Sequence, residues 1–168
     1  MDRESLRHIL VAAILGLALG LSGARAEASP WGFAAETGWI TAAADGSPFV
    51  FRITPAKMLS DEFSVGGSFY LTPAGDAGMY SGALVAQYHI RLKNGGISPF
   101  LGLGVAHRTS DSDGDTAFLF PIGSSFELPI GNELSFMGTV SFNIHDIELD
   151  GEQDTVSTGL TFGINYMP

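Results

Sequence analysis

Apolar and polar residues alternate along unusually long stretches of this chain, and this period of two constrains the fold more than any other feature. The clearest stretch is 133–145, ELSFMGTVSFNIH. Its apolar positions are Leu134, Phe136, Val140, Phe142 and Ile144. Successive side chains of a β-strand point to opposite faces, so this stretch predicts a strand with one apolar face and one mainly polar face.

Runs of this kind fill the chain after its first thirty residues and are separated by breaks rich in Gly, Pro, Asp and Asn. We expect strands at 31–41, 48–55, 62–72, 79–92, 97–107, 115–128, 133–145 and 154–166. No convincing helical periodicity lies between them. Eight strands with such spacing predict an all-β antiparallel meander that closes as a barrel.

Pro121 falls inside the run 115–128. Proline cannot donate a hydrogen bond to a strand ladder, and a closed barrel has no free edge. We therefore expect a β-bulge at this position. The alternative is a pair of short strands, 115–120 and 122–128, which would favour a soluble fold.

Alternation alone fits either a soluble barrel with an apolar interior or a membrane barrel with an apolar exterior. Three features favour the membrane. The runs 79–92 and 133–145 are long enough to cross a bilayer when tilted. Aromatic residues gather near the ends of the apolar faces, as in interfacial girdles. Tight connections at 56–61, 93–96 and 129–132 alternate with more acidic ones, of which 108–114 and 146–153 are long.

The first 26 residues have the pattern of an export signal. Arg3 and Arg7 precede an apolar run from Ile9 to Leu21, and Ala24-Arg25-Ala26 forms a small-x-small cleavage site. The run is shorter than the ~20 residues that a spanning helix needs. We expect cleavage near Ala26 and a single barrel domain at 27–168.

Charge and cysteine content exclude several classes of function. Residues 27–168 carry 5 basic and 16 acidic side chains, a net charge of −11, so nucleic acid is not an expected partner. The chain has no cysteine. An exported protein of this kind must therefore be held by hydrogen bonding and packing without disulfides.

Two stretches, SPFLGLGVA at 98–106 and STGLTFGINYMP at 157–168, match motifs of a known family. The first resembles the Pro-aromatic-Leu-Gly-x-Gly strand of the small eight-stranded outer-membrane β-barrel proteins of Gram-negative bacteria. The second resembles the assembly signal of that family, although members usually end on Phe or Trp and this chain ends Tyr166-Met167-Pro168. The residues assigned to the signal are Ser157, Gly159, Phe162, Ile164 and Tyr166. The resemblance implies a closed eight-stranded antiparallel up-and-down transmembrane barrel in the outer membrane, assembled by the outer-membrane machinery.

The polar face of the strands is expected to line the lumen. Its charged and hydrogen-bonding residues are Glu36, Arg52, Gln87, His89, Arg91, Glu127, Glu133, Asn143 and His145. An eight-stranded barrel is just wide enough for side chains to fill it. We interpret this set as a plug of salt bridges and hydrogen bonds rather than an ion path.

His145-Asp146 at a strand end invites comparison with barrel enzymes that modify lipid A, and Ser141 shares the face of His145. However, the His-x-Ser-Asn signature of the lipid A deacylase barrels is absent. We interpret His145 as a histidine at the rim of the barrel.

Acidic residues cluster in 111–115 and 146–154. The EF-hand pattern fails, because positions six and twelve counted from Asp111 hold Thr116 and Ile122 instead of Gly and Glu. We interpret these acids mainly as solvated loop residues. A weaker hypothesis is a divalent cation beside lipopolysaccharide phosphates, with ligands among Asp111, Asp113, Asp115, Asp146, Glu148 and Asp150.

Together these observations predict a monomeric, non-enzymatic outer-membrane barrel without a cofactor, in contact with lipid and lipopolysaccharide. Its role would be structural or surface interaction, with a filled lumen and short acidic external loops. The alternative is a soluble periplasmic barrel that encloses a small apolar ligand, as lipocalins do. A lipid A-modifying enzyme is the third hypothesis.

Overall fold

The computed structural model describes residues 31–41, 49–71, 78–109, 114–149 and 152–167. The expected signal peptide, residues 1–26, lies outside these ranges. In the described part of the chain no helix is long and apolar enough to cross a membrane.

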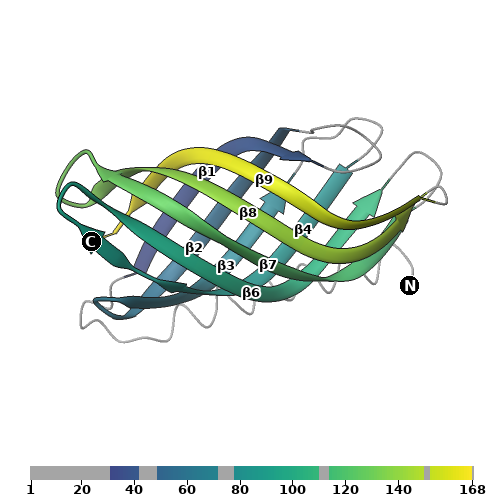
Figure 1. The fold of residues 1–168 in the computed structure, drawn as a ribbon, viewed down its shortest axis with the longest axis horizontal. Coiled ribbons are helices and arrows are strands. Elements are labelled where there is room, and N and C mark those ends of the chain that lie inside the picture. The colour runs from purple at the N-terminus through teal and green to yellow at the C-terminus, as the bar shows by residue number, and fades with distance from the viewer. Residues whose placement is uncertain (1–30, 42–48, 72–77, 110–113, 150–151, 168) are drawn as a thin grey trace.

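The described residues form one closed antiparallel sheet (Figure 1). The strands are β1 (Trp31–Thr41), β2 (Phe49–Ser60), β3 (Phe63–Leu71), β4 (Gly78–Tyr88), β5 (Ile90–Leu92), β6 (Gly95–Thr109), β7 (Gly114–Pro129), β8 (Leu134–Leu149) and β9 (Glu152–Tyr166). Strands that follow each other in the sequence pair with each other, except β4 and β5, which both pair with β6. β1 also pairs with β9, where Trp39 lies opposite Leu160.

The wall has eight strands, because β4 and β5 are two parts of one. Both pair with β6 in the same register: Gln87 lies opposite Phe100, and Ile90 lies opposite Ile97. The interruption at His89 falls where Pro99 is the nearby β6 residue, which cannot donate to the ladder. The predicted closed eight-stranded antiparallel barrel is therefore confirmed.

Proline is accommodated without bulges. At Pro121 the β6–β7 ladder passes from Leu101 opposite Ile122 to Gly104 opposite Leu119 with no change of register. The β7–β8 ladder pairs Pro121 directly with Asn143. The predicted bulge and the alternative pair of short strands are both wrong, because the wall simply omits two pairs on one side of the proline.

The strands are also longer than the sequence pattern indicated. β2 continues through Pro55 to Ser60, so the connection predicted at 56–61 is a turn of two residues, Asp61 and Glu62. β6 ends at Thr109 and β7 begins at Gly114. Likewise, β8 ends at Leu149 and β9 begins at Glu152. Much of the predicted loops 108–114 and 146–153 is therefore strand.

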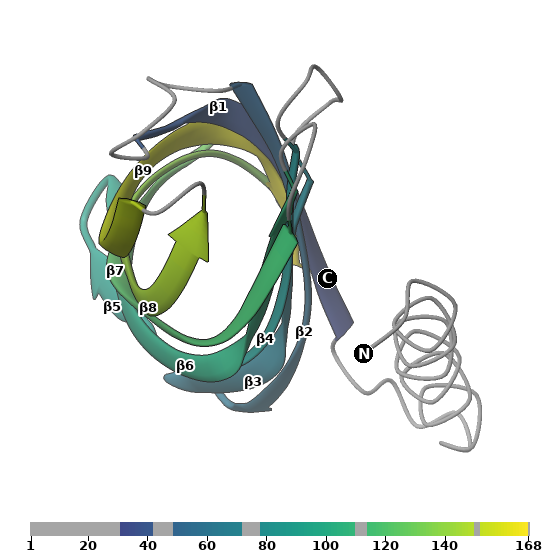
Figure 2. The ribbon, with the colours of Figure 1, turned by 90° about the vertical axis from the view of Figure 1, so that its right-hand side faces the viewer.

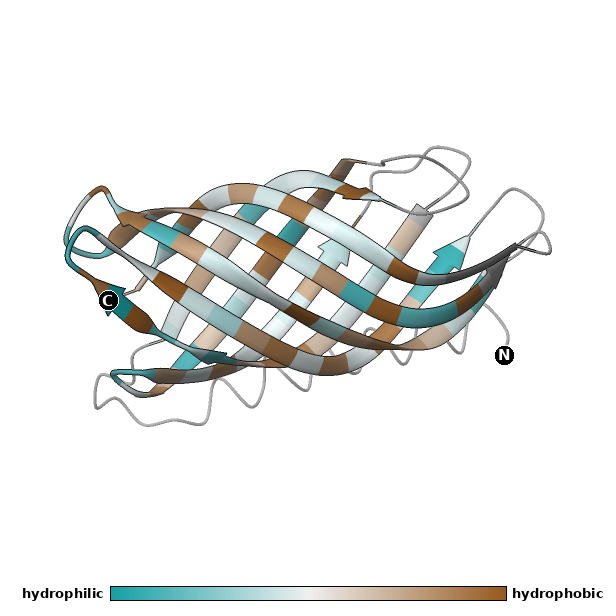
Figure 3. Ribbon diagram, viewed as in Figure 1, coloured by the Kyte–Doolittle hydropathy of each residue, from teal (hydrophilic) through white to brown (hydrophobic). Residues whose placement is uncertain are grey.

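Hydropathy alternates along the strands (Figure 3), and the burial of the side chains shows that the two faces of the wall follow the predicted alternation. Large apolar side chains point outward and are exposed, among them Phe33, Trp39, Phe51, Leu84, Leu101, Phe118, Phe142, Leu160, Phe162 and Ile164. Most polar side chains on the opposite face are buried in the lumen. The soluble, lipocalin-like alternative required apolar faces turned inward and is wrong.

The two ends of the barrel differ. We call the end with the connections at 61–62, 93–94 and 130–133 the turn end, and the opposite end the loop end. Met167, the last described residue, lies at the turn end, where its backbone N–H donates to the carbonyl of Glu133 at 2.8 Å.

Candidate functional site

Arg52 on β2 occupies the middle of the lumen and is 1 % exposed. Its Nη1 lies 3.2 Å from Oε2 of Glu36, the residue directly opposite on β1. Its Nε donates to Oγ of Ser68 at 3.0 Å. The guanidinium carbon also lies 5.4 Å from the ring centroid of Tyr70 and 4.9 Å from that of Phe100. A single cation thus binds groups from β1, β3 and β6, on different sides of the barrel.

Further hydroxyl groups complete this centre. Thr161 on β9 donates to Oε1 of Glu36 at 2.8 Å, which gives the carboxylate a second partner. Tyr70 donates from its hydroxyl to Oγ of Ser141 on β8 at 3.3 Å. A buried ion pair is tolerated only when its polar atoms find partners. Ser68 and Thr161 hydrogen-bond Arg52 Nε and Glu36 Oε1, whereas Arg52 Nη1 and Glu36 Oε2 are partners of each other in the ion pair.

A second network crosses the lumen nearer the turn end. His89 Nε2 lies 2.8 Å from Oγ of Ser64, and His89 Nδ1 lies 2.9 Å from Oγ of Ser98. Ser98 donates to Oε1 of Glu127 at 3.2 Å, and the Asn165 amide donates to Oε2 of Glu127 at 3.1 Å. Because the Ser98 proton is directed at Glu127, its oxygen accepts a hydrogen bond from Nδ1 of His89.

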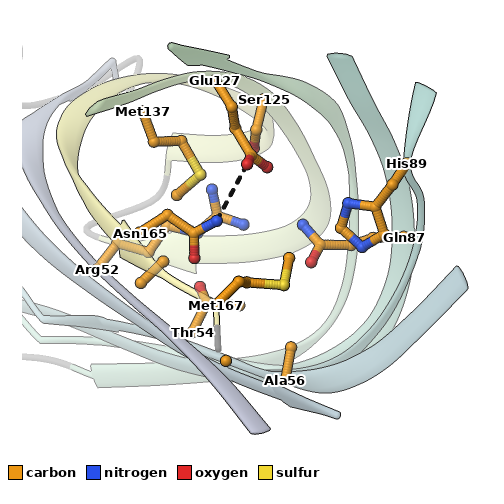
Figure 4. Close-up of a pocket in the computed structure, with 12 residues that line it drawn as sticks. Arg52, Thr54, Ala56, Gln87, His89, Ser125, Glu127, Met137, Asn165 and Met167 are labelled. Atoms are coloured by element: carbon orange, nitrogen blue, oxygen red, sulfur yellow. Dashed lines mark hydrogen bonds between the residues drawn. The ribbon is translucent and has the colours of Figure 1, made fainter. Parts of the chain in front are cut away.

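A small cavity of about 20 Å³ lies between these two networks (Figure 4). Its lining includes Arg52, Thr54, Gln87, Glu127 and Asn165. Such a volume is sufficient for roughly one water molecule. The lumen at this level is filled by side chains.

The loop-end half of the lumen is mostly apolar. The buried apolar cluster comprises Ile40, Val50, Tyr70, Met79, Ala83, Val85, Phe100, Ala106, Leu119 and Ile147. Polar side chains on β8 and β9 face it from one side: His145 Nε2 lies 3.3 Å from Oγ of Ser157, and Asn143 is buried nearby in sequence on the same face.

His145 was expected on the lumen face and at the rim of the barrel; it does face the lumen, but it is 5 % exposed and therefore buried. Its serine contact is with Ser157, whereas Ser141 contacts Tyr70. The alternation that placed Ser141 and His145 on one face was correct, but a shared face does not determine which side chains meet across neighbouring strands.

Arg91 and Glu133 were expected in the lumen and instead lie exposed at the turn end. Arg91 on β5 donates to the backbone carbonyl of Asp61 at 3.4 Å. It borders an open recess of about 630 Å³ whose lining also includes Met58, Lys93 and Ser135. Both residues lie where the strands end, beyond the filled part of the lumen.

The acidic residues proposed to bind a divalent cation are only partly described. Asp111, Asp113 and Asp150, and the side chain of Glu148, lie outside the described residues. Asp115 is on β7 opposite Arg108, and Asp146 is an exposed residue of β8. In the part of the chain that can be inspected, no three acidic or histidine side chains converge on a metal site. The cation site stays a prediction.

The residues assigned to the assembly signal all lie on β9. Ser157 and Gly159 face the lumen, whereas Phe162, Ile164 and Tyr166 face outward. Their role in assembly stays a prediction.

Several lumen residues were missed by the sequence analysis. They are the small polar side chains Ser64, Ser68, Ser98, Ser125, Thr139, Thr161 and Asn165. Ser125 and Thr139, for example, place their hydroxyl oxygens 2.8 Å apart. Their position on the polar face was a usable signal, because hydroxyls buried beside charges are generally hydrogen-bonded.

Comparison with solved structures places this architecture among known proteins. The neisserial surface protein A shares 19 % identity at a TM-score of 0.58, over 81 % of this chain and 96 % of that one. The N-terminal β-barrel domain of Pseudomonas aeruginosa OprF shares 17 % identity at a TM-score of 0.52, over 80 % of this chain and 97 % of that domain. A major outer-membrane protein of Thermus thermophilus shares 12 % identity at a TM-score of 0.54, over 84 % of this chain and 100 % of that one.

No protein-family model and no curated protein sequence matches the chain. The structural matches cover nearly the whole length of each barrel, and the belt of exposed apolar side chains is the one expected of that class. The chain therefore has the fold of the small eight-stranded outer-membrane β-barrel proteins.

Proposed function

We propose that this protein is a monomeric, non-enzymatic component of the outer membrane with a structural or surface-interaction role, and that its lumen does not conduct. The observation that carries the proposal is the position of Arg52, which binds Glu36, Ser68 and two aromatic rings across the barrel interior. Opening a path past it would require separating a buried ion pair, which is costly.

The outward face supports insertion in lipid. Apolar side chains such as Leu84, Leu101 and Phe162 are exposed around the barrel. At the turn end, the Tyr88 hydroxyl donates to Glu62 at 3.2 Å, as suits an aromatic residue at a membrane–water interface. In the proposed orientation the turn end faces the periplasm and the loop end faces the exterior, after export by the signal at 1–26.

The surroundings of His145 argue against lipid A chemistry. A nucleophile acting on a lipid must be reachable from the outer surface, but His145 and Ser157 are both buried on the lumen side. Ser141 is engaged by Tyr70. We therefore assign no catalytic residue.

The test combines location and conductance. Cell fractionation should find the protein in the outer membrane, and the purified protein should migrate differently on a gel before and after boiling. In planar lipid bilayers we expect no steady single-channel current. Recovery in the soluble periplasm would overturn the membrane assignment, whereas regular channel openings of the natural protein would overturn the filled-lumen role.

A further inference from the structure

The barrel wall opens between β7 and β8 towards the loop end. Pairing between these strands ends at Phe120 opposite Ile144. Beyond that point β7 continues paired with β6, where Phe118 lies opposite Val105. β8 continues paired with β9, where Ile147 lies opposite Asp154. The two hairpins therefore separate at the loop end.

The β8–β9 hairpin bends at this separation. Its ladder changes register between Ile144 and Ile147, as at a β-bulge, and bulges bend the strands that contain them. Figure 2 looks into the loop end and shows the last part of β8 curving across the opening of the barrel. Ile147 is 0 % exposed and belongs to the apolar cluster with Ile40, Met79 and Leu119.

We propose that the described loop-end parts of these two strands, Asp146–Leu149 of β8 and Glu152–Thr155 of β9, are a lid that closes the loop end of the lumen. The Ile147 side chain holds the lid closed by packing in the apolar cluster. The lid opens when β8 rejoins β7 along the register that the two strands already share.

The register defines the open state. Phe120 opposite Ile144 and Ile122 opposite Phe142 continue, two residues at a time, to Phe118 opposite Asp146. Phe118 and Asp146 are exposed in the closed state and point to the same outer face of the wall. β7 begins at Gly114 and β8 ends at Leu149, which in this register lies opposite Asp115, so the two strands extend equally far to within one residue.

Different interactions stabilise the closed and the open state. The closed lid removes the Ile147 side chain from water, whereas the open lid adds backbone hydrogen bonds between β7 and β8. Opposed terms of this kind make an element with two discrete arrangements. The lid controls only access of water to the apolar loop-end half of the lumen, because the Arg52 centre closes the lumen beneath it in either state. The inference therefore goes beyond the proposed function and does not require it.

A cysteine beneath the lid measures its position, since the natural chain has no cysteine. Ala106→Cys, at a fully buried site in the Ile147 cluster, is to be treated with a water-soluble maleimide in detergent micelles. We expect Ile147→Asp to accelerate labelling by about 10- to 100-fold, the factor for losing one buried aliphatic side chain. Thr41→Cys, which is exposed, should react equally in both backgrounds.

Equal labelling of Ala106→Cys with Ile147 and with Ile147→Asp, in barrels that keep their heat-dependent gel shift, would overturn the lid. If Ile147→Asp does not fold, Ile147→Ala replaces it and should accelerate labelling in the same direction. Unchanged labelling of that variant would also overturn the proposal.

A disulfide tests the opening route. Phe118→Cys with Asp146→Cys places two thiols opposite each other only in the rejoined register, where a bridge can form. Thr116→Cys with Asp146→Cys is the matched pair, two residues out of register. We expect mild oxidation to link the first pair at least about tenfold faster, because opening presents only that pair in bonding geometry. Equal rates, or no bridge in either pair, would overturn the route.

Discussion

The two halves of the lumen are filled by different chemistry. The turn-end half is cross-linked by charged and hydrogen-bonding groups, with Arg52, Glu36, His89 and Glu127 in two networks. The loop-end half is mainly apolar and is covered by Ile147. The first half depends on directional partners from several strands, whereas the second depends on shape and volume. The halves should therefore respond differently to the loss of a single side chain.

The largest effect is expected from Arg52→Ala. Removal of the cation leaves the Glu36 carboxylate buried, with Thr161 as its only hydrogen-bond partner among the residues that the structure describes. Breaking a buried pair from one side costs about 3–5 kcal/mol of the free energy of unfolding. Urea titration in lipid vesicles, followed by tryptophan fluorescence, measures this loss.

The paired replacement Glu36→Leu with Arg52→Met is the control for that variant. Two apolar residues of similar volume leave no unpaired charge, so most of the lost stability should return. If the pair of substitutions is as damaging as Arg52→Ala alone, the turn-end half owes its stability to something other than charge pairing.

A smaller loss is expected from Leu119→Ala in the apolar half. Leu119 is 1 % exposed and belongs to the same buried cluster as Met79. The substitution leaves a cavity costing about 2–3 kcal/mol, because a flexible methionine in the cluster can fill part of the space. The matched variant Leu103→Ala, on the outward face, leaves no internal cavity and should cost less in the same titration. Equal losses would contradict the assignment of the two faces.

Ser98→Ala tests whether the turn-end half acts as a network. The hydroxyl lies between His89 and Glu127, so its removal interrupts the path that connects β4–β5 with β7. A buried hydrogen-bonding group left without its partner costs about 1–2 kcal/mol. Ser124→Ala is the control, because the Ser124 hydroxyl makes no hydrogen bond to any residue that the structure describes.

The smallest effect is expected outside the lumen. Tyr88→Phe removes the hydroxyl that donates to Glu62 on the exposed turn-end rim. Water and lipid headgroups can replace such a bond, so the free energy of unfolding should not change measurably. A loss comparable to that of Ser98→Ala would indicate that the rim contributes as much as the lumen.

Much of the fold could be predicted from the sequence. Alternation placed Leu134, Phe136 and Phe142 on the outer face and Met137 and Asn143 on the inner one, as the structure has them. The same signal identified the number of strands. The ends of the longest strands were not predicted, because the acidic residues of 146–149 and 152–154 have the composition of a solvated loop. In the structure these residues belong to β8 and β9.

Less of the candidate site could be predicted. Glu36 and Arg52 were recognised as lumen residues, but nothing in the sequence indicated that they lie opposite each other or that Phe100 approaches the same guanidinium. Arg91 was assigned to the lumen because its parity is inward, yet it lies beyond the filled interior. The alternation shows whether a side chain points inward or outward, but not how far along the barrel axis the residue lies.

The sequence by itself determined which face each side chain takes, because a strand repeats every two residues whatever surrounds it. Only the tertiary structure decided which lumen residues meet, since strand tilt and stagger determine the height of each residue in a closed barrel. The same closure decided that Ile147 covers the loop end. Ile147 lies on the inward-facing side of β8, but it reaches the apolar cluster because β8 bends after Ile144. That bend depends on how β8 pairs with both β7 and β9.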